Sequence, residues 1–200
     1  MACISGLAHN MLKIISVASP LSLATVIAQQ PHFMEALSSL GLQLTVADPF
    51  HFTIKNRLGK PIFEYTYLPQ YYAGIHSWLG FVEMAQMKAV IEYLVSQSEQ
   101  NHLPAMRCIS DFSLCEGGFS EAMEWFANEI LPRIIPLGFR GEAIILPKDF
   151  YAELTIDDFK DLIKEIACEH VYFDNLVEGM AWLEAHKAKK TAKVTPSGPN

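Results

Sequence analysis

Residues 51–80 read HFTIKNRLGKPIFEYTYLPQYYAGIHSWLG and hold three consecutive segments that are typical of β-strands. Residues 51–55 alternate between polar and apolar side chains, and residues 61–67 and 71–80 are rich in aromatic and β-branched residues. Residues 56–60 (NRLGK) contain a glycine and connect the first two segments, which predicts a β-hairpin. The stretch therefore predicts an opening meander of three strands.

Beyond residue 80, helical and strand patterns alternate along the chain. Residues 81–97 place apolar side chains at steps of three and four, which is typical of an amphipathic helix. Residues 142–146 (EAIIL) are nearly continuously apolar, as in a strand that helices cover on both faces. The remaining pattern predicts strands over residues 105–109 and 170–173 and helices over residues 120–137, within 150–167 and after Asp174 or Asn175. This order predicts an α/β fold with a mixed sheet of four to six strands that is flanked by helices.

Composition and charge limit the classes of function. The chain has 200 residues, of which 50% are hydrophobic, which is enough for one domain with a sizeable core. Residues 1–186 carry 11 basic and 22 acidic side chains, so the body of the protein is strongly acidic. Nucleic acids require a basic face, and they are therefore excluded as main ligands. Residues 187–200 hold four lysines and no acid, and they are expected to form a basic disordered tail.

The N-terminal segment is expected to lie outside the domain. Residues 1–33 contain one charged side chain, Lys13, and residues 14–28 are apolar except for three serines. This run is shorter than the roughly 20 apolar residues of a membrane helix, so no stable membrane insertion is expected. Residues 14–28 are similar to a signal peptide, and on that alternative the protein would be exported, but Pro20 interrupts the apolar run. We expect residues 1–49 to be a poorly structured extension, residues 50–186 to be the domain, and the protein to be cytoplasmic.

The four cysteines do not form a pattern of disulfides or metal ligands. Cys3, Cys108, Cys115 and Cys168 include no CxxC pair and no pairing with histidine at zinc-ligand spacing. Reduced cysteines of this kind suit the cytosol. No glycine-rich nucleotide-binding motif occurs either. The sequence predicts neither a metal site nor a cofactor.

Five segments in a fixed order resemble a known family. They are Trp78 with Gly80 and Phe81, residues 125–133 (WFANEILPR), Gly138, residues 143–147 (AIILP) and residues 172–183 (YFDNLVEGMAWL). In this order and spacing the chain resembles the SpoIIAA-like, STAS-related domains, which are largely uncharacterised bacterial proteins. The resemblance covers about residues 50–185 and implies a four- or five-stranded sheet flanked by helices. STAS domains share this architecture with the CRAL-TRIO lipid-binding domains.

One departure from the family pattern affects the expected function. Anti-sigma-factor antagonists of the STAS type carry an Asp-Ser-Ser/Thr-Gly turn whose serine is phosphorylated. The corresponding residues 110–122 here read SDFSLCEGGFSEA, where Phe112 separates Asp111 from Ser113. A phosphate on Ser113 or Ser120 would lie near a helix N-terminus, which favours anions, but the motif itself is absent.

The expected binding site is the loop over residues 111–118, because ligands of open α/β sheets bind beyond the carboxyl ends of strands. Asp111, Ser113 and Ser120 are expected to line this site. Arg133 is expected to bind either an acidic side chain such as Glu129 or an anionic ligand. The histidines are spread over separate predicted elements, so no catalytic triad is predicted.

These features predict a non-catalytic module that binds a protein partner or a small ligand. Two alternatives remain open: a small hydrolase that uses Cys115 or Ser113, and a lipid-binding pocket of the CRAL-TRIO type. The aromatic run over residues 63–78 holds more large side chains than one strand pair can easily bury. Some of them are expected to be exposed and to form a homodimer or partner surface.

Overall fold

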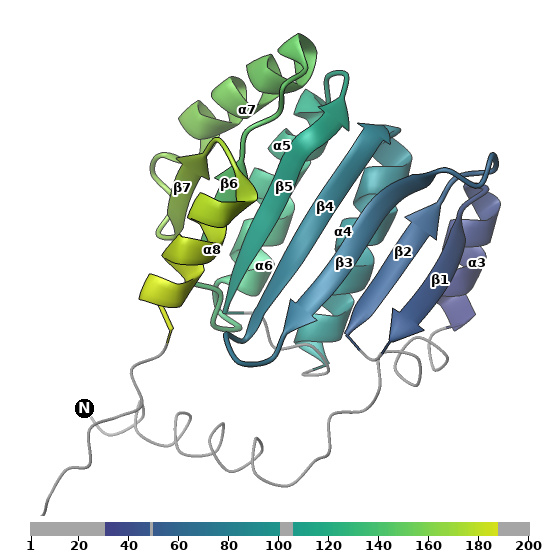
Figure 1. The fold of residues 1–200 in the computed structure, drawn as a ribbon, viewed down its shortest axis with the longest axis horizontal. Coiled ribbons are helices and arrows are strands. Elements are labelled where there is room, and N and C mark those ends of the chain that lie inside the picture. Colours follow the sequence, from purple (N-terminus) through teal and green to yellow (C-terminus); the bar gives the residue numbers. More distant parts are fainter. Residues whose placement is uncertain (1–30, 49, 101–105, 188–200) are drawn as a thin grey trace, which may run out of the picture.

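A computed structural model describes residues 31–48, 50–100 and 106–187, which form a seven-stranded mixed sheet with helices on both faces (Figure 1). The strands lie side by side in the order in which they occur in the chain. Their bounds are β1 Gln43–Asp48, β2 His51–Lys55, β3 Pro61–Leu68, β4 Ala73–Phe81, β5 Arg107–Glu116, β6 Gly141–Ile145 and β7 Glu169–Phe173. The α/β class, the mixed sheet and the flanking helices agree with the expectation, but the sheet has seven strands rather than four to six.

The N-terminal half of the sheet is an antiparallel meander. β1 to β4 pair in sequence, each antiparallel to the one before it. In the turn between β2 and β3, Asn56 Oδ1 accepts hydrogen bonds from the backbone N–H groups of Leu58 and Lys60, at 3.0 and 3.1 Å. Gly59 has a φ of +72°, which glycine adopts without strain. The predicted hairpin and the third strand are confirmed.

The C-terminal half of the sheet is parallel, and its crossover helices lie on one face. The crossovers are α4 Met84–Glu99, then α5 Ser120–Trp125, η1 Phe126–Ile130 and α6 Leu131–Ile134 in succession, then α7 Phe150–Ile163. Helix α3 Pro31–Ser39 packs beside α4 on this face, and Figure 1 shows these helices behind the sheet. Helix α8 Leu176–Ala185 lies in front, against β5, β6 and β7.

The two faces of the sheet hold two cores of unequal size. The larger core joins the sheet to α3–α7 and includes the fully buried Phe52, Phe63 and Phe159. The smaller one lies under α8, where Trp182 and Leu183 pack on apolar residues of the parallel strands. The face bearing α3–α7 therefore contains most of the space in which a site could be enclosed.

Strand β5 corrects one expectation. The strand was expected over residues 105–109 and a loop over residues 110–118, but β5 continues to Glu116. The polar residues of SDFSLCE suggested a loop, although Ser110, Phe112 and Cys115 are buried in the sheet. A strand that carries polar side chains on a buried face lacks the apolar pattern by which a strand is recognised.

The sheet also begins before residue 50, the expected start of the domain. Helix α3 and strand β1 lie in the segment that was expected to be an extension, and β1 pairs with β2. β1 is an edge strand with mostly exposed side chains, so its sequence (QLTVAD) carries little apolar pattern. The signal-like run over residues 14–28 and the tail after residue 187 lie outside the described residues. Within the described residues, no helix is long and apolar enough to span a bilayer.

The aromatic side chains of the hairpin are more buried than expected. Phe63, Tyr65, Tyr67 and Trp78 are all less than 10% exposed, because α3 and α4 cover their face of the sheet. Of the Phe, Tyr and Trp side chains of this run, only Tyr71 and Tyr72 are partly exposed, so the exposed surface that was expected is confined to them. Self-association through the hairpin stays a prediction.

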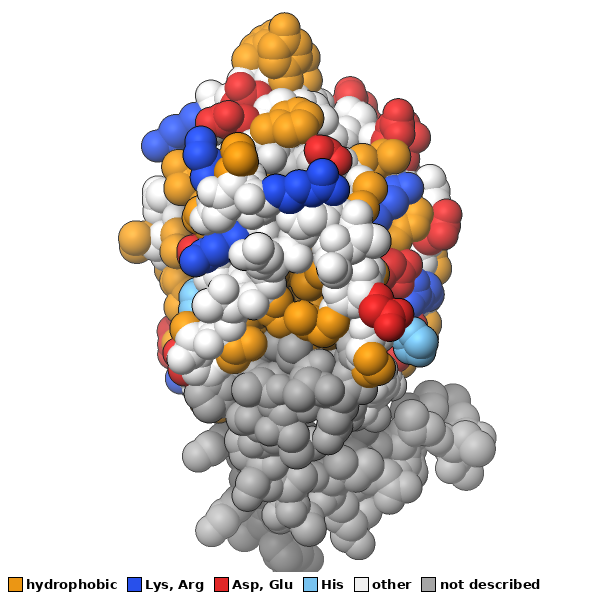
Figure 2. Space-filling model, turned by 90° about the vertical axis from the view of Figure 1, so that its right-hand side faces the viewer, with side chains coloured by type: hydrophobic (Ala, Val, Ile, Leu, Met, Phe, Trp, Pro, Cys, Tyr) orange, Lys and Arg blue, Asp and Glu red, His pale blue; other side chains and the backbone are white. Residues whose placement is uncertain are grey.

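The β1 edge of the molecule shows basic and acidic side chains interspersed (Figure 2).

Candidate functional site

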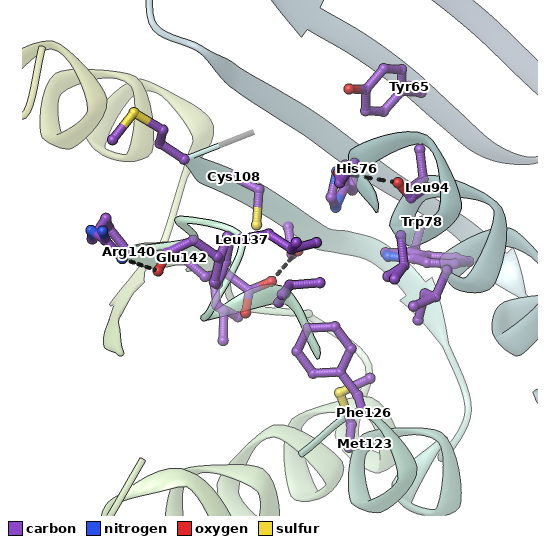
Figure 3. Close-up of a pocket in the computed structure, with 18 of the residues that line it drawn as sticks. Tyr65, His76, Trp78, Leu94, Cys108, Met123, Phe126, Leu137, Arg140 and Glu142 are labelled. Atoms are coloured by element: carbon purple, nitrogen blue, oxygen red, sulfur yellow. Dashed lines mark hydrogen bonds between the residues drawn. The ribbon is translucent and has the colours of Figure 1, made fainter. Parts of the chain in front are cut away.

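A cavity of about 220 Å³ lies between the sheet and helices α4–α6. Most of its wall is apolar and comes from both layers (Figure 3). Its apolar lining includes Trp78, Leu94, Met123, Phe126, Ile144 and Phe159. Polar side chains of the sheet form its floor. A largely apolar cavity with a few converging polar groups is typical of a site for a small molecule.

The polar residues of the floor are neighbours because of the strand register. Tyr65 on β3 pairs with His76 on β4, and His76 pairs with Ser110 on β5. Cys108 pairs with Glu142 on β6, which in turn pairs with His170 on β7. Residues two apart in a strand share a face, so all six side chains belong to the face that bears α3–α7. We name this set the polar row: Tyr65, His76, Cys108, Ser110, Glu142 and His170. The first five line the cavity, and His170 lies beside Glu142 outside the lining.

The Glu142 carboxylate lies at the centre of the polar row and is only 5% exposed. Its Oε1 accepts a hydrogen bond from Ser110 Oγ, and its Oε2 lies 3.5 Å from Nδ1 of His170. Burial alone would raise the pKa of Glu142, but His170, Ser110 and His76 together outweigh it and hold that pKa below its ordinary value. Glu142 is therefore an ionised group inside an apolar layer.

His170 is the second deeply buried polar side chain of the row, 5% exposed. Neither of its ring nitrogens makes a hydrogen bond to any residue that the structure describes, so its approach to Glu142 is not aligned as one. Its ring meets Phe159 edge-on, at 6.0 Å between centroids. Buried polar groups are nearly always hydrogen-bonded, so the two ring nitrogens of His170 are an exception.

Two neutral rings complete the row on the other side. His76 stacks on Tyr65 with 5.5 Å between the ring centroids. Burial lowers the pKa of His76 to about 4, although Glu142 opposes this shift, so the imidazole is uncharged at neutral pH. Burial, together with neighbouring groups such as Tyr67, raises the pKa of Tyr65 well above its ordinary value. Both side chains can thus form hydrogen bonds without carrying charge.

A turn of π-helix shapes the opposite wall of the cavity. Phe126–Ile130 forms η1, in which the Leu131 N–H donates to the carbonyl of Phe126, five residues earlier. Pro132 follows at once; its ring would collide with the carbonyl four residues before it in a regular α-helix. The wider turn relieves this conflict and lies where Phe126 lines the cavity. Such π-turns are frequent at functional sites.

The cavity reaches the molecular surface where β5 and β6 begin. Met106 and Leu137 line it and are 39% and 44% exposed. Arg140 lines the same end, and its Nη1 donates to the carbonyl of Phe139 at 3.2 Å. In Figure 3 its guanidinium lies apart from the Glu142 carboxylate. This end is the natural entrance for a small molecule.

The structure does not bring the four predicted site residues together. Asp111 and Ser113 lie on β5, where Asp111 Oδ1 accepts from the Ser113 N–H at 3.0 Å. Asp111 alternates with Ser110 and therefore points away from the cavity. Ser120 begins α5 and contacts Thr155 Oγ1 at 3.3 Å. Arg133 forms ion pairs with Glu92 at 2.9 Å and Glu99 at 3.1 Å, so its partners are acids on α4 rather than Glu129.

The thiol considered as a nucleophile is in an unsuitable environment. Cys115 is 2% exposed and belongs to the large core. Burial raises its pKa to about 12, whereas a nucleophilic cysteine needs a lowered pKa. Within the described residues, no group of three or more histidine, cysteine or acidic side chains is placed to hold a metal ion.

Sequence reasoning missed the polar row. His76 and His170 were set aside as members of unrelated elements, yet both lie on one face of one sheet. One signal was available: Glu142 opens an otherwise apolar strand (EAIIL), and a carboxylate in such a strand needs a buried partner. Which partner it meets depends on strand order, which the sequence does not state.

Comparisons with known proteins give no further guidance to the site. The chain matches no protein-family model, no curated protein and no solved structure.

Proposed function

We propose that this domain is a non-catalytic module that binds a small, largely apolar molecule in the cavity between the sheet and α4–α6. The observation that carries the proposal is the cavity of about 220 Å³ with apolar walls, whose floor is formed by the polar row except for His170. An apolar cavity of about 150 Å³ accommodates a benzene ring. The volume therefore suits a molecule with one ring or a short branched chain.

The expected family supports the same function. A mixed sheet flanked by helices is the coarse architecture that the SpoIIAA-like, STAS-related resemblance implies. The enclosed cavity favours a small ligand over a purely surface-binding module. A cavity of about 220 Å³ suits one ring or a short chain, so it favours a small molecule over a lipid of the CRAL-TRIO type.

The test uses the whole protein and benzyl alcohol as a neutral probe, with binding followed by ligand-observed NMR. We expect binding to the wild type and at least about tenfold weaker binding to Leu94→Trp, because the larger side chain fills the cavity. Met84→Trp is the control: Met84 is on the same helix but 38% exposed and outside the cavity. Native mass spectrometry of the purified protein would identify a ligand that remains bound.

Two results would overturn the proposal. One is that the wild type neither binds benzyl alcohol nor retains a small molecule. The other is that Leu94→Trp, folded by circular dichroism, binds the probe as tightly as Met84→Trp does.

A further inference from the structure

The charge in the cavity floor is negative and lacks a permanently positive partner. Among the described residues, the recorded ion-pair contact of Glu142 is with His170, at 3.5 Å and without a hydrogen bond. The nearest arginine of the cavity lining, Arg140, is turned toward the carbonyl of Phe139. Burying an ionised carboxylate is unfavourable unless a cation is paired with it through hydrogen bonds. A positive charge delivered by a ligand would offset this cost.

The carboxylate has unused capacity to accept hydrogen bonds. Ser110 donates a hydrogen bond to Oε1 of Glu142, and Oε2 lies 3.5 Å from Nδ1 of His170. A carboxylate offers about four lone-pair directions, so a donor from a ligand can still be accepted. His76 is next to Ser110 in the row, and its uncharged imidazole can accept one more hydrogen bond.

Aromatic faces near the carboxylate add a second preference for positive charge. Tyr65, Trp78 and Phe126 all line the cavity. The faces of such rings are negative and attract organic cations, and most strongly so where water is excluded. Figure 3 shows Trp78 and Phe126 on different sides of the enclosed space.

We infer that the ligand of this cavity is an organic cation, an apolar body bearing a protonated amine, whose ammonium group donates to Glu142. This inference rests on the proposed function, since it specifies the chemical class of the molecule that the cavity binds. The amine would lie on the sheet side of the cavity, and the apolar body would lie against α4–α6.

The test compares three probes of one size that differ in charge at pH 7: benzylamine as the cation, benzyl alcohol as the neutral molecule and benzoate as the anion. We expect benzylamine to bind the full-length protein about tenfold or more tightly than benzyl alcohol, because its ammonium adds a charge–charge attraction to the hydrogen bond that either molecule can donate to Glu142. Benzoate is expected to bind most weakly. Isothermal titration or ligand-observed NMR at low and moderate salt gives the three affinities.

Two variants separate charge from shape. Glu142→Gln removes the charge and is expected to abolish the preference for benzylamine while binding of benzyl alcohol persists. Glu142→Asp keeps the charge and should keep a preference for the cation. Circular dichroism checks that each variant is folded, and the comparison of probes on the wild type does not depend on either variant.

The possible failures are distinguishable. If none of the three probes binds and the purified protein retains no small molecule, the proposed function itself fails. If benzyl alcohol or benzoate binds the wild type as tightly as benzylamine does, the cation inference is overturned while the cavity remains a binding site. A preference for benzylamine that is unchanged in folded Glu142→Gln would likewise overturn the inference, because the charge would then come from elsewhere.

Discussion

At the scale of single residues, Gly74 determines whether the polar row can form. A Cβ at this position would lie 2.8 Å from Cε2 of Tyr65 and 3.0 Å from Nε2 of His76. The rings of Tyr65 and His76 therefore lie where a larger residue at 74 would place its side chain. We expect Gly74→Ala to lower the free energy of unfolding by about 1–3 kcal/mol, the usual cost of an overpacked core. Urea unfolding measures the change.

Gly118→Ala is the matched control for this prediction. The nearest atom to a Cβ at 118 is Thr155 Oγ1 at 3.7 Å, an ordinary contact. The free energy of unfolding should therefore change by about 0.5 kcal/mol or less. Equal effects of the two substitutions would show that the contact with Tyr65 and His76 does not constrain the fold.

At the scale of elements, α8 is held on the sheet by two buried side chains, Trp182 and Leu183. Trp182 is 8% exposed, and its Nε1 donates to Glu169 Oε1 at 3.3 Å. Its ring also lies 5.9 Å from the guanidinium of Arg107. We expect Trp182→Ala to lower the free energy of unfolding by about 3 kcal/mol, since it empties the centre of the small core. Urea unfolding and binding of an apolar dye would report this loss.

Val177, on the same helix, provides the comparison. It is 77% exposed, so Val177→Ala should change the free energy of unfolding by no more than about 0.5 kcal/mol. Should Trp182→Ala prove as mild as Val177→Ala, α8 would have to be held by other contacts, such as the hydrogen bond between Tyr71 and Glu184 at 2.5 Å.

At the scale of the whole molecule, the polar row makes stability depend on pH. The pKa of His76 is about 4 in the folded protein and near 6.5 when unfolded, so between these values the unfolded chain binds more protons. Stability should therefore fall by about 3 kcal/mol as the pH drops from about 6.5 to 4. The lowered pKa of Glu142 adds a contribution that is lost as the pH falls through its folded value. Urea unfolding at pH 7 and at pH 4.5 tests this.

The variant His76→Gln isolates the histidine in that pH range. It should flatten the stability curve between pH 6.5 and 4, while His32→Gln, at a 98% exposed side chain, should leave the curve unchanged. The same loss in His76→Gln as in the wild type would assign the pH dependence to other groups.

Local patterns were sufficient to predict most elements of this protein. The alternation in HFTIK predicts the strand that the structure has as β2, His51–Lys55, and Asn175 caps α8 as one of two expected residues. These features depend on side-chain spacing and on turn and cap residues, whose effects act over a few positions. Elements with mixed patterns, such as the exposed edge strand β1 and the polar part of β5, could not be recognised in this way.

The candidate site was decided by tertiary structure alone. Glu142, His76 and His170 are far apart in the chain and became neighbours only because β4–β7 pair in parallel and in order. The sequence by itself determined an acidic α/β domain with an opening meander, because periodicity and net charge are local or additive properties. Strand order and the cavity beneath the helices depend on contacts between distant residues. A buried glutamate, serine and histidine therefore looked like ordinary members of separate elements until the sheet placed them on one face.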